Sequence, residues 1–108
     1  MHTRTKLPEL ARWWEAEKEK PTALLFPTDN VAVGFLAEAR ERGISVPKDV
    51  AVVGFDNSSI AELFNLTTID YPMHLQAENA FFKLYNQLKH KNLPLHPLSF
   101  KLIIRGTT

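Results

Sequence analysis

Short apolar runs bounded by proline or glycine alternate along this chain with longer segments of helical periodicity. The runs Ala23–Phe26 and Val50–Val53 contain no polar residue, which is typical of strands buried on both faces of a parallel sheet. The full pattern predicts further strands over 67–71 and 98–105, and helices over 7–20, 28–43, 58–63 and 75–90. Alternating helices and strands favour an α/β fold. We therefore predict three layers, a mostly parallel sheet flanked by helices.

Proline and glycine mark the ends of several of these elements. Pro8 suits the first position of the first helix, and Pro21 stops it. Gly43 is a natural left-handed cap for the second helix. The six residues before the first helix, 1–6, are expected to form a loose terminus.

Length and composition limit the function classes. With 108 residues the chain holds one small domain at most, and its formal net charge of +1 is too small to indicate a nucleic-acid surface. The absence of cysteine excludes disulfides, thiolate metal sites and a cysteine nucleophile. No apolar run is long enough for a membrane helix, and no signal core follows residues 1–6. We expect a cytoplasmic protein that does not associate with membranes.

Three carboxylates fall where the predicted strands end, at Asp29, Asp56 and Asp70. In an open α/β sheet, ligands bind outside the carboxyl ends of the strands, so the three side chains are expected to face one crevice. Each has a plainer interpretation. Asp29 also fits a helix cap, Asp56 a turn, and Asp70 a solvated strand end.

Catalytic and cofactor patterns are missing from the sequence. The four histidines lack metal-ligand spacing, Ser58 and Ser59 have no evident base, and the four glycines are isolated. We predict neither an enzyme nor a cofactor. Trp13 is a candidate for stacking on a sugar, against the alternative of plain packing.

Several segments occur together in the order and at about the spacing of one protein family. The most specific is Val46–Asn57 followed by Leu66–Ile69; the others are Pro21–Phe26, Thr28–Gly34 and Ile104–Thr107. On these segments the chain resembles the last third of LacI/GalR-type transcriptional regulators. The effector domain of that family resembles periplasmic sugar-binding proteins, in which two α/β lobes clamp a ligand.

The resemblance implies a division of the chain into parts of the family's fold. Residues 7–72 correspond to the core of the C-terminal lobe and 98–105 to its final strand. Residues 73–92 correspond to a crossover helix that belongs to the other lobe in the family.

The resemblance also implies effector-binding residues, Thr28, Asp29, Asp56 and Asn57. The family usually has an Asn-Asp pair where this chain has Thr28-Asp29, so the usual amide contact is missing. An aspartate at the position of Asp56 commonly accepts hydrogen bonds from effector hydroxyls, as an ionised carboxylate does well. Asn57 stands where a second aspartate is frequent. The ligand implied is a small sugar-like or nucleoside-like molecule.

The family binds DNA through an N-terminal helix-turn-helix head, which this chain does not contain. Without the rest of the other lobe, the apolar stripe of the long helix lacks its usual cover, and such a surface marks an interface. We therefore predict a homodimer, with the possibility that this helix is exchanged between chains. The stripe consists of Phe81, Phe82, Leu84, Tyr85 and Leu88.

Three alternatives stay open at this stage. The chain is a self-associating fragment without ligand activity, or the long helix folds back on the core, or the three carboxylates bind Mg²⁺ as in receiver-like modules. The last alternative lacks a matching lysine and a plausible nucleophile.

Overall fold

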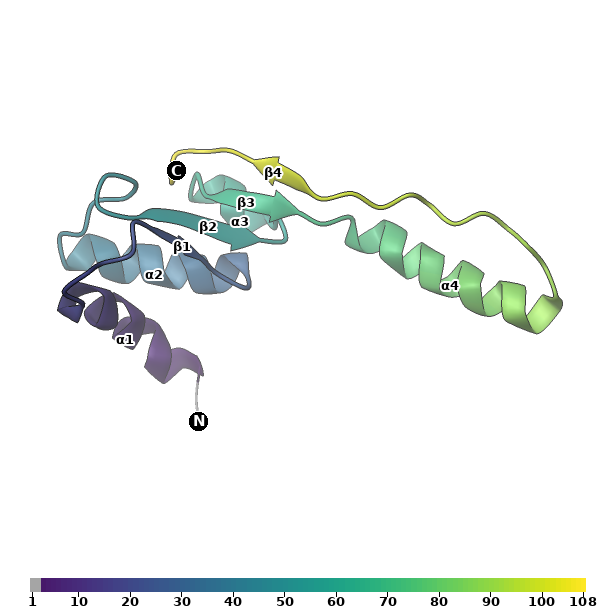
Figure 1. The fold of residues 1–108 in the computed structure, drawn as a ribbon, viewed down its shortest axis with the longest axis horizontal. Coiled ribbons are helices and arrows are strands. Elements are labelled where there is room, and N and C mark those ends of the chain that lie inside the picture. The colour runs from purple at the N-terminus through teal and green to yellow at the C-terminus, as the bar shows by residue number, and fades with distance from the viewer. Residues whose placement is uncertain (1–2) are drawn as a thin grey trace. The chain divides into compact units, whose positions relative to one another are not determined.

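The computed structural model describes residues 3–108, with side chains from Leu10 onward. The chain forms two compact units, one of residues 3–70 with 102–108 and one of residues 71–101. The elements follow one another in Figure 1 as α1 (Thr3–Ala16), β1 (Ala23–Leu25), α2 (Asp29–Glu41), β2 (Ala51–Phe55), α3 (Ser59–Leu63), β3 (Thr67–Asp70), α4 (Met73–Lys89) and β4 (Lys101–Ile103).

Four strands form one sheet in the order β1-β2-β3-β4. β1, β2 and β3 are parallel, with Leu24 opposite Val52 and Gly54 opposite Thr68. β4 lies next to β3 and runs the opposite way in Figure 1. The predicted α/β class with a mostly parallel sheet is confirmed. This order brings the carboxyl ends of three parallel strands to one edge of the sheet.

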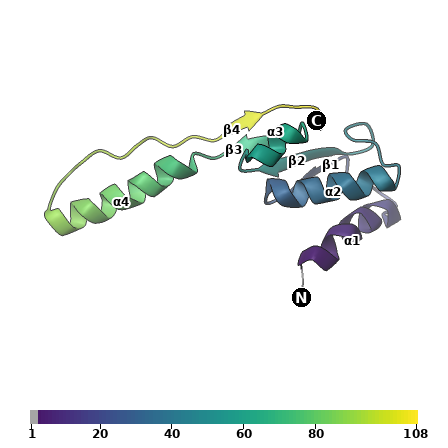
Figure 2. The same cartoon turned by 180° about the vertical axis from the view of Figure 1, so that it is seen from behind.

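Helices α2 and α3 cover one face of the sheet, and Figure 2 shows both in front of the strands. α2 begins at Asp29, one residue later than the predicted range, because Thr28 is its N-cap and accepts a hydrogen bond from the Val31 N–H at 3.3 Å. Arg42 is its C-cap, and Gly43 follows with φ at 73°. That conformation is natural for glycine and closes the helix.

The core of the first unit lies between the helices and the sheet. Phe35, Val52 and Leu66 are completely buried, and the rings of Phe26 and Phe35 lie 5.3 Å apart. Burial of each such side chain stabilises the fold by roughly 1.5–3 kcal/mol. On the opposite side of β1, Leu25 is 66% exposed, so the helices described in this unit cover one face only.

An arginine at the end of α2 ties α1 to α2. Arg42 donates to Glu38 on α2 at 2.8 Å and to Glu15 on α1 at 2.7 Å. The hydrogen bonds to Glu38 and then Glu15 raise the pKa of Arg42 above its usual value. Because the pKa of Arg42 is raised, its guanidinium stays protonated near neutrality, and these ion pairs do not weaken there through arginine titration.

The second unit consists of α4 and an extended segment, residues 91–100, that returns along it (Figure 1). We call this segment the strap. Asn86 both accepts from the Leu93 N–H and donates to the Leu93 carbonyl, each at 3.0 Å. Asn79 does the same with His96, at 2.7 and 3.0 Å. Two side-chain amides on one helix thus replace the ladder that a neighbouring strand would supply.

Three expectations about element boundaries need correction, and the first is that α1 ends at Ala16 rather than continuing to residue 20 before Pro21. α1 already includes Thr3, so residues 3–6 are helical rather than loose, and Met1 and His2 lie outside the described residues. Proline removes only one helical hydrogen bond, so Pro8 does not prevent the helix from starting earlier. β4 covers Lys101–Ile103 only, since residues 104–108 leave the strand and bond to β2 and β3 instead.

Candidate functional site

A buried carboxylate joins the three segments at the carboxyl edge of the sheet. The Oδ1 atom of Asp29 accepts from the Thr68 hydroxyl at 2.6 Å. Its Oδ2 atom accepts from the Ser58 N–H at 2.7 Å and from the Ser58 hydroxyl at 3.0 Å. Only 2% of Asp29 is exposed. Three donors therefore compensate for the burial of this group, and α2, β3 and the loop after β2 are fixed to one another.

The close approach of this carboxylate explains Gly54 in β2. A Cβ at position 54 would overlap Asp29 Oδ1 and would lie 2.9 Å from Leu66 Cδ2. Any side chain there would push the carboxylate out of its place. The glycine in the motif is therefore required by the packing of α2 against the sheet.

The loop of residues 56–58 is held by every one of its backbone N–H groups. Asp56 donates to the Ile69 carbonyl at 2.9 Å, Asn57 to the Thr68 hydroxyl at 3.3 Å, and Ser58 to Asp29. No backbone donor of the loop is left for a ligand. Any recognition at this loop therefore falls to the side chains.

Two consecutive residues of the loop have left-handed backbone conformations, Asp56 with φ at 111° and Asn57 with φ at 54°. Asn57 lies in the region that asparagine tolerates, whereas Asp56 lies outside the commonly populated regions. Strain of this kind costs of order 1–3 kcal/mol and persists where the surroundings impose it, often at functional sites. Here the three backbone hydrogen bonds impose it. The Asp56 side chain is exposed and that of Asn57 is partly exposed.

The predicted site residues play different parts in this arrangement. Thr28 is the cap of α2, and Asp29 is a buried cross-link rather than the cap. Asp56 is exposed, and Thr28 and Asn57 are both partly exposed. Asp70 ends β3 and is partly exposed, and Trp13 lies on α1 with 47% of its surface exposed. The hydrogen bonds thus connect Asp29 to the loop of Asp56 and Asn57, as the motif order implies.

The sequence did not indicate how much the end of the chain contributes. Thr107 Oγ1 donates to the Val52 carbonyl at 2.7 Å and accepts from the Thr67 N–H at 2.9 Å. Arg105 donates to the Leu66 carbonyl at 2.9 Å and to Asn57 Oδ1 at 3.1 Å. The only signal was the match of Ile104–Thr107 to the family, because no local pattern predicts bonds across this separation.

A groove of about 740 Å³ lies elsewhere, at the end of α2 that adjoins the amino ends of the strands. None of the four predicted effector residues lines it. Its lining residues are Leu36, Ala37, Arg40, Glu41, Val46, Phe64, Asn65, Gly106 and Thr107.

Neither a metal-binding cluster nor a helix able to span a membrane occurs among the residues that the structure describes. No three histidine or acidic side chains there are arranged to hold a metal ion. The oxygens of Asp29 are already occupied by Ser58 and Thr68, which leaves them poorly suited to Mg²⁺. No helix between residues 3 and 108 has the length and hydropathy to cross a membrane.

Comparison with known proteins places this geometry in a family. The model of the periplasmic binding protein-like domain matches residues 1–108. The chain is 33% identical over 94 residues to the HTH-type transcriptional regulator YkvZ of Bacillus subtilis, covering 87% of this chain and 29% of YkvZ. It is 40% identical over 96 residues to the HTH-type transcriptional repressor PurR of Vibrio parahaemolyticus, covering 85% of this chain and 29% of that repressor.

Solved structures of LacI family regulators have a similar fold. A LacI family regulator from Lactobacillus casei with bound TRIS superposes with a TM-score of 0.83 at 26% identity, covering 99% of this chain and 42% of that one. The same regulator with bound glucose gives 0.80 at 27% identity, with 99% and 40% covered. The fold thus matches part of the structure of LacI-family regulators. The chain belongs to the periplasmic binding protein-like domains of LacI-type transcriptional regulators, and it spans less than a third of the length of these two curated relatives.

Proposed function

We propose that this chain is the effector-sensing portion of a cytoplasmic LacI-type regulator and that it is not an enzyme. The observation that carries the proposal is the loop of residues 56–58, whose backbone is fully bonded while the side chains of Asp56 and Asn57 stay accessible. A rigid loop that offers polar side chains recognises a ligand without a large cost of ordering. Binding to DNA would require a separate head.

The ligand that this loop fits best is a small polyhydroxylated or nucleoside-like molecule. The Asp56 carboxylate accepts hydroxyl hydrogens, and Asn57 supplies an amide. Asp29 contributes by holding the loop, and Thr28 by starting α2 next to it. The Lactobacillus casei relative has been solved with glucose and with sucrose, which supports a sugar.

A ligand clamped between two lobes gains affinity from both walls, and this lobe supplies one of them. Groups on one wall leave much of a small ligand in water, so we expect weak binding by this chain alone. A Kd weaker than about 1 mM for glucose corresponds to less than roughly 4 kcal/mol of binding free energy.

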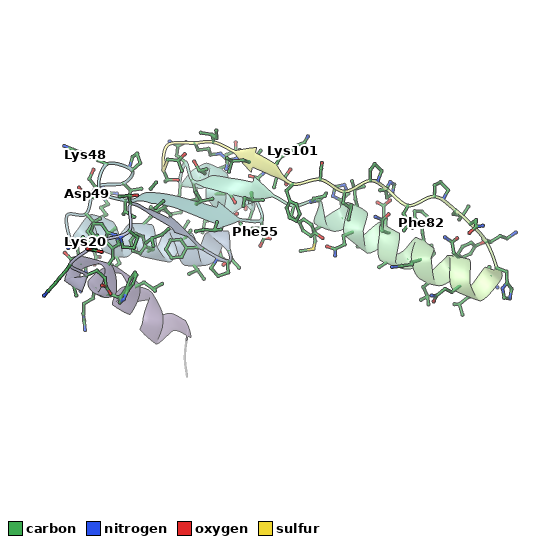
Figure 3. All side chains as sticks on the ribbon, viewed as in Figure 1. Lys20, Lys48, Asp49, Phe55, Phe82 and Lys101 are labelled. Atoms are coloured by element: carbon green, nitrogen blue, oxygen red, sulfur yellow. The ribbon has the colours of Figure 1, made fainter. Side chains whose placement is uncertain are left out.

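The test is a titration of the ¹⁵N-labelled chain with a panel of sugars and purine nucleosides, followed by amide chemical shifts. We expect small shifts confined to residues 55–58 and their neighbours, and their loss in Asp56→Asn. Asp49→Asn is the matched control, since Asp49 and Phe55 lie at opposite ends of β2 in Figure 3. Chemical shift changes centred on residues 36–41, or no changes with any compound, would contradict the proposal. A micromolar Kd would contradict the expectation that this chain, with one wall of the cleft, binds weakly.

A second proposal concerns association. We propose that the chain forms a homodimer through the stripe Phe81, Phe82, Leu84, Tyr85 and Leu88 of α4. Phe81, Leu84 and Leu88 are 62%, 56% and 68% exposed, and none of the residues of α4 is buried. Apolar side chains in such a row indicate an interface.

A further inference from the structure

The Asn57 side chain meets a group that can only donate hydrogen bonds. Arg105 Nη2 donates to Asn57 Oδ1 at 3.1 Å, while Nη1 of the same guanidinium donates to the Leu66 carbonyl at 2.9 Å. The backbone N–H of Arg105 donates to Thr67 Oγ1 at 2.8 Å. A planar guanidinium held at its backbone and at two acceptors has little freedom to turn.

This contact decides which end of the Asn57 amide faces Arg105. The guanidinium carries five N–H donors and no acceptor, so it must face the amide oxygen. The reversed amide would set N–H groups against N–H groups and leave a polar contact unsatisfied. The Nδ2 group of Asn57 therefore points away from Arg105.

An aspartate at this position would present a different surface. Both of its oxygens would accept, one from Arg105 and one from a ligand. With asparagine the loop offers an acceptor at Asp56 and, next to it, a donor at Asn57.

We propose that Arg105 is a positioning residue that holds the Asn57 amide with its donor end toward the ligand, so that the site selects molecules presenting an acceptor beside a donor. The inference deepens the proposed function and rests on it. Adjacent sugar hydroxyls and the edge of a nucleoside base both have this chemistry. Arg105 stands two residues after β4 in the sequence, and it belongs to the same compact unit as Asn57.

The first test needs no ligand. In Asn57→Asp the introduced carboxylate lies against the Arg105 guanidinium, so its pKa is expected to be lower by about one than in Asn57→Asp combined with Arg105→Gln. Carboxyl ¹³C shifts of the labelled 108-residue chain give both values. Arg40→Gln is the control, since it removes a distant positive charge and should leave the value unchanged. Equal pKa values with and without Arg105 would overturn the positioning role.

A folding defect in Arg105→Gln would not block this test. Arg105→Lys keeps the charge but lacks the planar guanidinium that donates to two acceptors, so we expect an intermediate pKa for the introduced carboxyl. A value in Arg105→Lys equal to that with Arg105 would show that charge alone acts, and would overturn the oriented contact.

The second test uses glucose and adenosine with the unmodified chain, Asn57→Asp and Asp49→Asn. Loss of one hydrogen-bond donor is expected to weaken binding about fivefold in Asn57→Asp and not in Asp49→Asn. Hydroxyls can rotate to suit two acceptors, whereas a base edge cannot, so the loss should be larger for adenosine if the ligand is a nucleoside. If the carboxyl titration succeeds and neither compound shifts residues 55–58, the proposed function fails while the contact of Arg105 stands. Equal binding by Asn57→Asp overturns the selection.

Discussion

At the scale of single residues, the candidate site depends on one buried carboxylate and on the space left for it. Asp29 accepts three hydrogen bonds at 2% exposure, and Gly54 is the residue that allows its approach to β2. The side chains of Asp56 and Asn57 stay accessible because the backbone N–H groups of both residues are hydrogen-bonded to β3. Structural and recognition roles are therefore divided between neighbouring residues.

Replacing Gly54 by alanine is expected to destabilise the first unit by about 3 kcal/mol, because the new Cβ overlaps the Asp29 carboxylate and crowds Leu66. Urea unfolding followed by circular dichroism measures this change. The control is Gly43→Ala, where nothing lies within 4 Å and only the conformation at φ of 73° is disfavoured, at about 1 kcal/mol. Equal losses in the two variants would show that the overlap is relieved without cost.

Replacing Asp29 by asparagine is expected to cost about 3 kcal/mol of unfolding free energy. The amide offers one acceptor oxygen where three donors converge, and its own N–H group faces further donors. The same exchange at exposed Asp56 should stay within about 0.5 kcal/mol. Chemical denaturation of both variants decides this, and an unchanged stability in Asp29→Asn would mean that the carboxylate is not needed as a cross-link.

At the scale of elements, the helix and the strap of the second unit are joined by side-chain amides. Asn79 and Asn86 are seven residues apart on α4 and hold His96 and Leu93, three residues apart on the strap. Seven helical residues rise about 10.5 Å, and three extended residues cover about 9–10 Å. The two repeats match, so both amides reach the strap at equivalent backbone groups. Phe82, labelled in Figure 3, adds a ring contact to His96 at 5.9 Å.

Asn86→Ala is expected to speed hydrogen exchange of the Leu93 amide about fivefold, because its acceptor is removed. The His96 amide should keep its protection, since Asn79 still accepts from it. Gln87→Ala on the same helix is the control and should change neither amide. Native-state exchange followed by NMR measures all three, and an unaltered Leu93 rate in Asn86→Ala would show that the strap is held by other contacts.

Local sequence signals predicted most of the helices and strands, but they did not predict the long-range hydrogen bonds at the candidate site. The apolar runs of β1 and β2 and the glycine after α2 act within a few residues, so the sequence alone predicts them. Arg105 and Thr107 act over sequence separations of 38 to 55 residues, and nothing in their own neighbourhood specifies a partner. The burial of Asp29 also depends on tertiary packing. Sequence position indicated that it belongs to the site, but its role as a cross-link follows from the three donors around it.

At the scale of the whole molecule, the chain is expected to associate through α4. Size-exclusion chromatography with light scattering at about 100 µM should show a dimer. Leu84→Lys places a charge in the middle of the stripe and should give a monomer, because an unpaired charge buried in an interface is strongly unfavourable. Gln87→Lys adds the same charge on an exposed position of α4 and should leave the dimer intact. A monomer in the unmodified chain would refute the association.

The matched spacing of α4 and its strap restricts how this part of the chain can change in length. Deleting one or two residues between Leu93 and His96 would bring a different backbone group to Asn79, and only one of the two amides would still be satisfied. Insertion of three residues there, accompanied by seven on the helix between Asn79 and Asn86, would preserve the pairing. Sequence variation in this segment is therefore expected to proceed in steps of three.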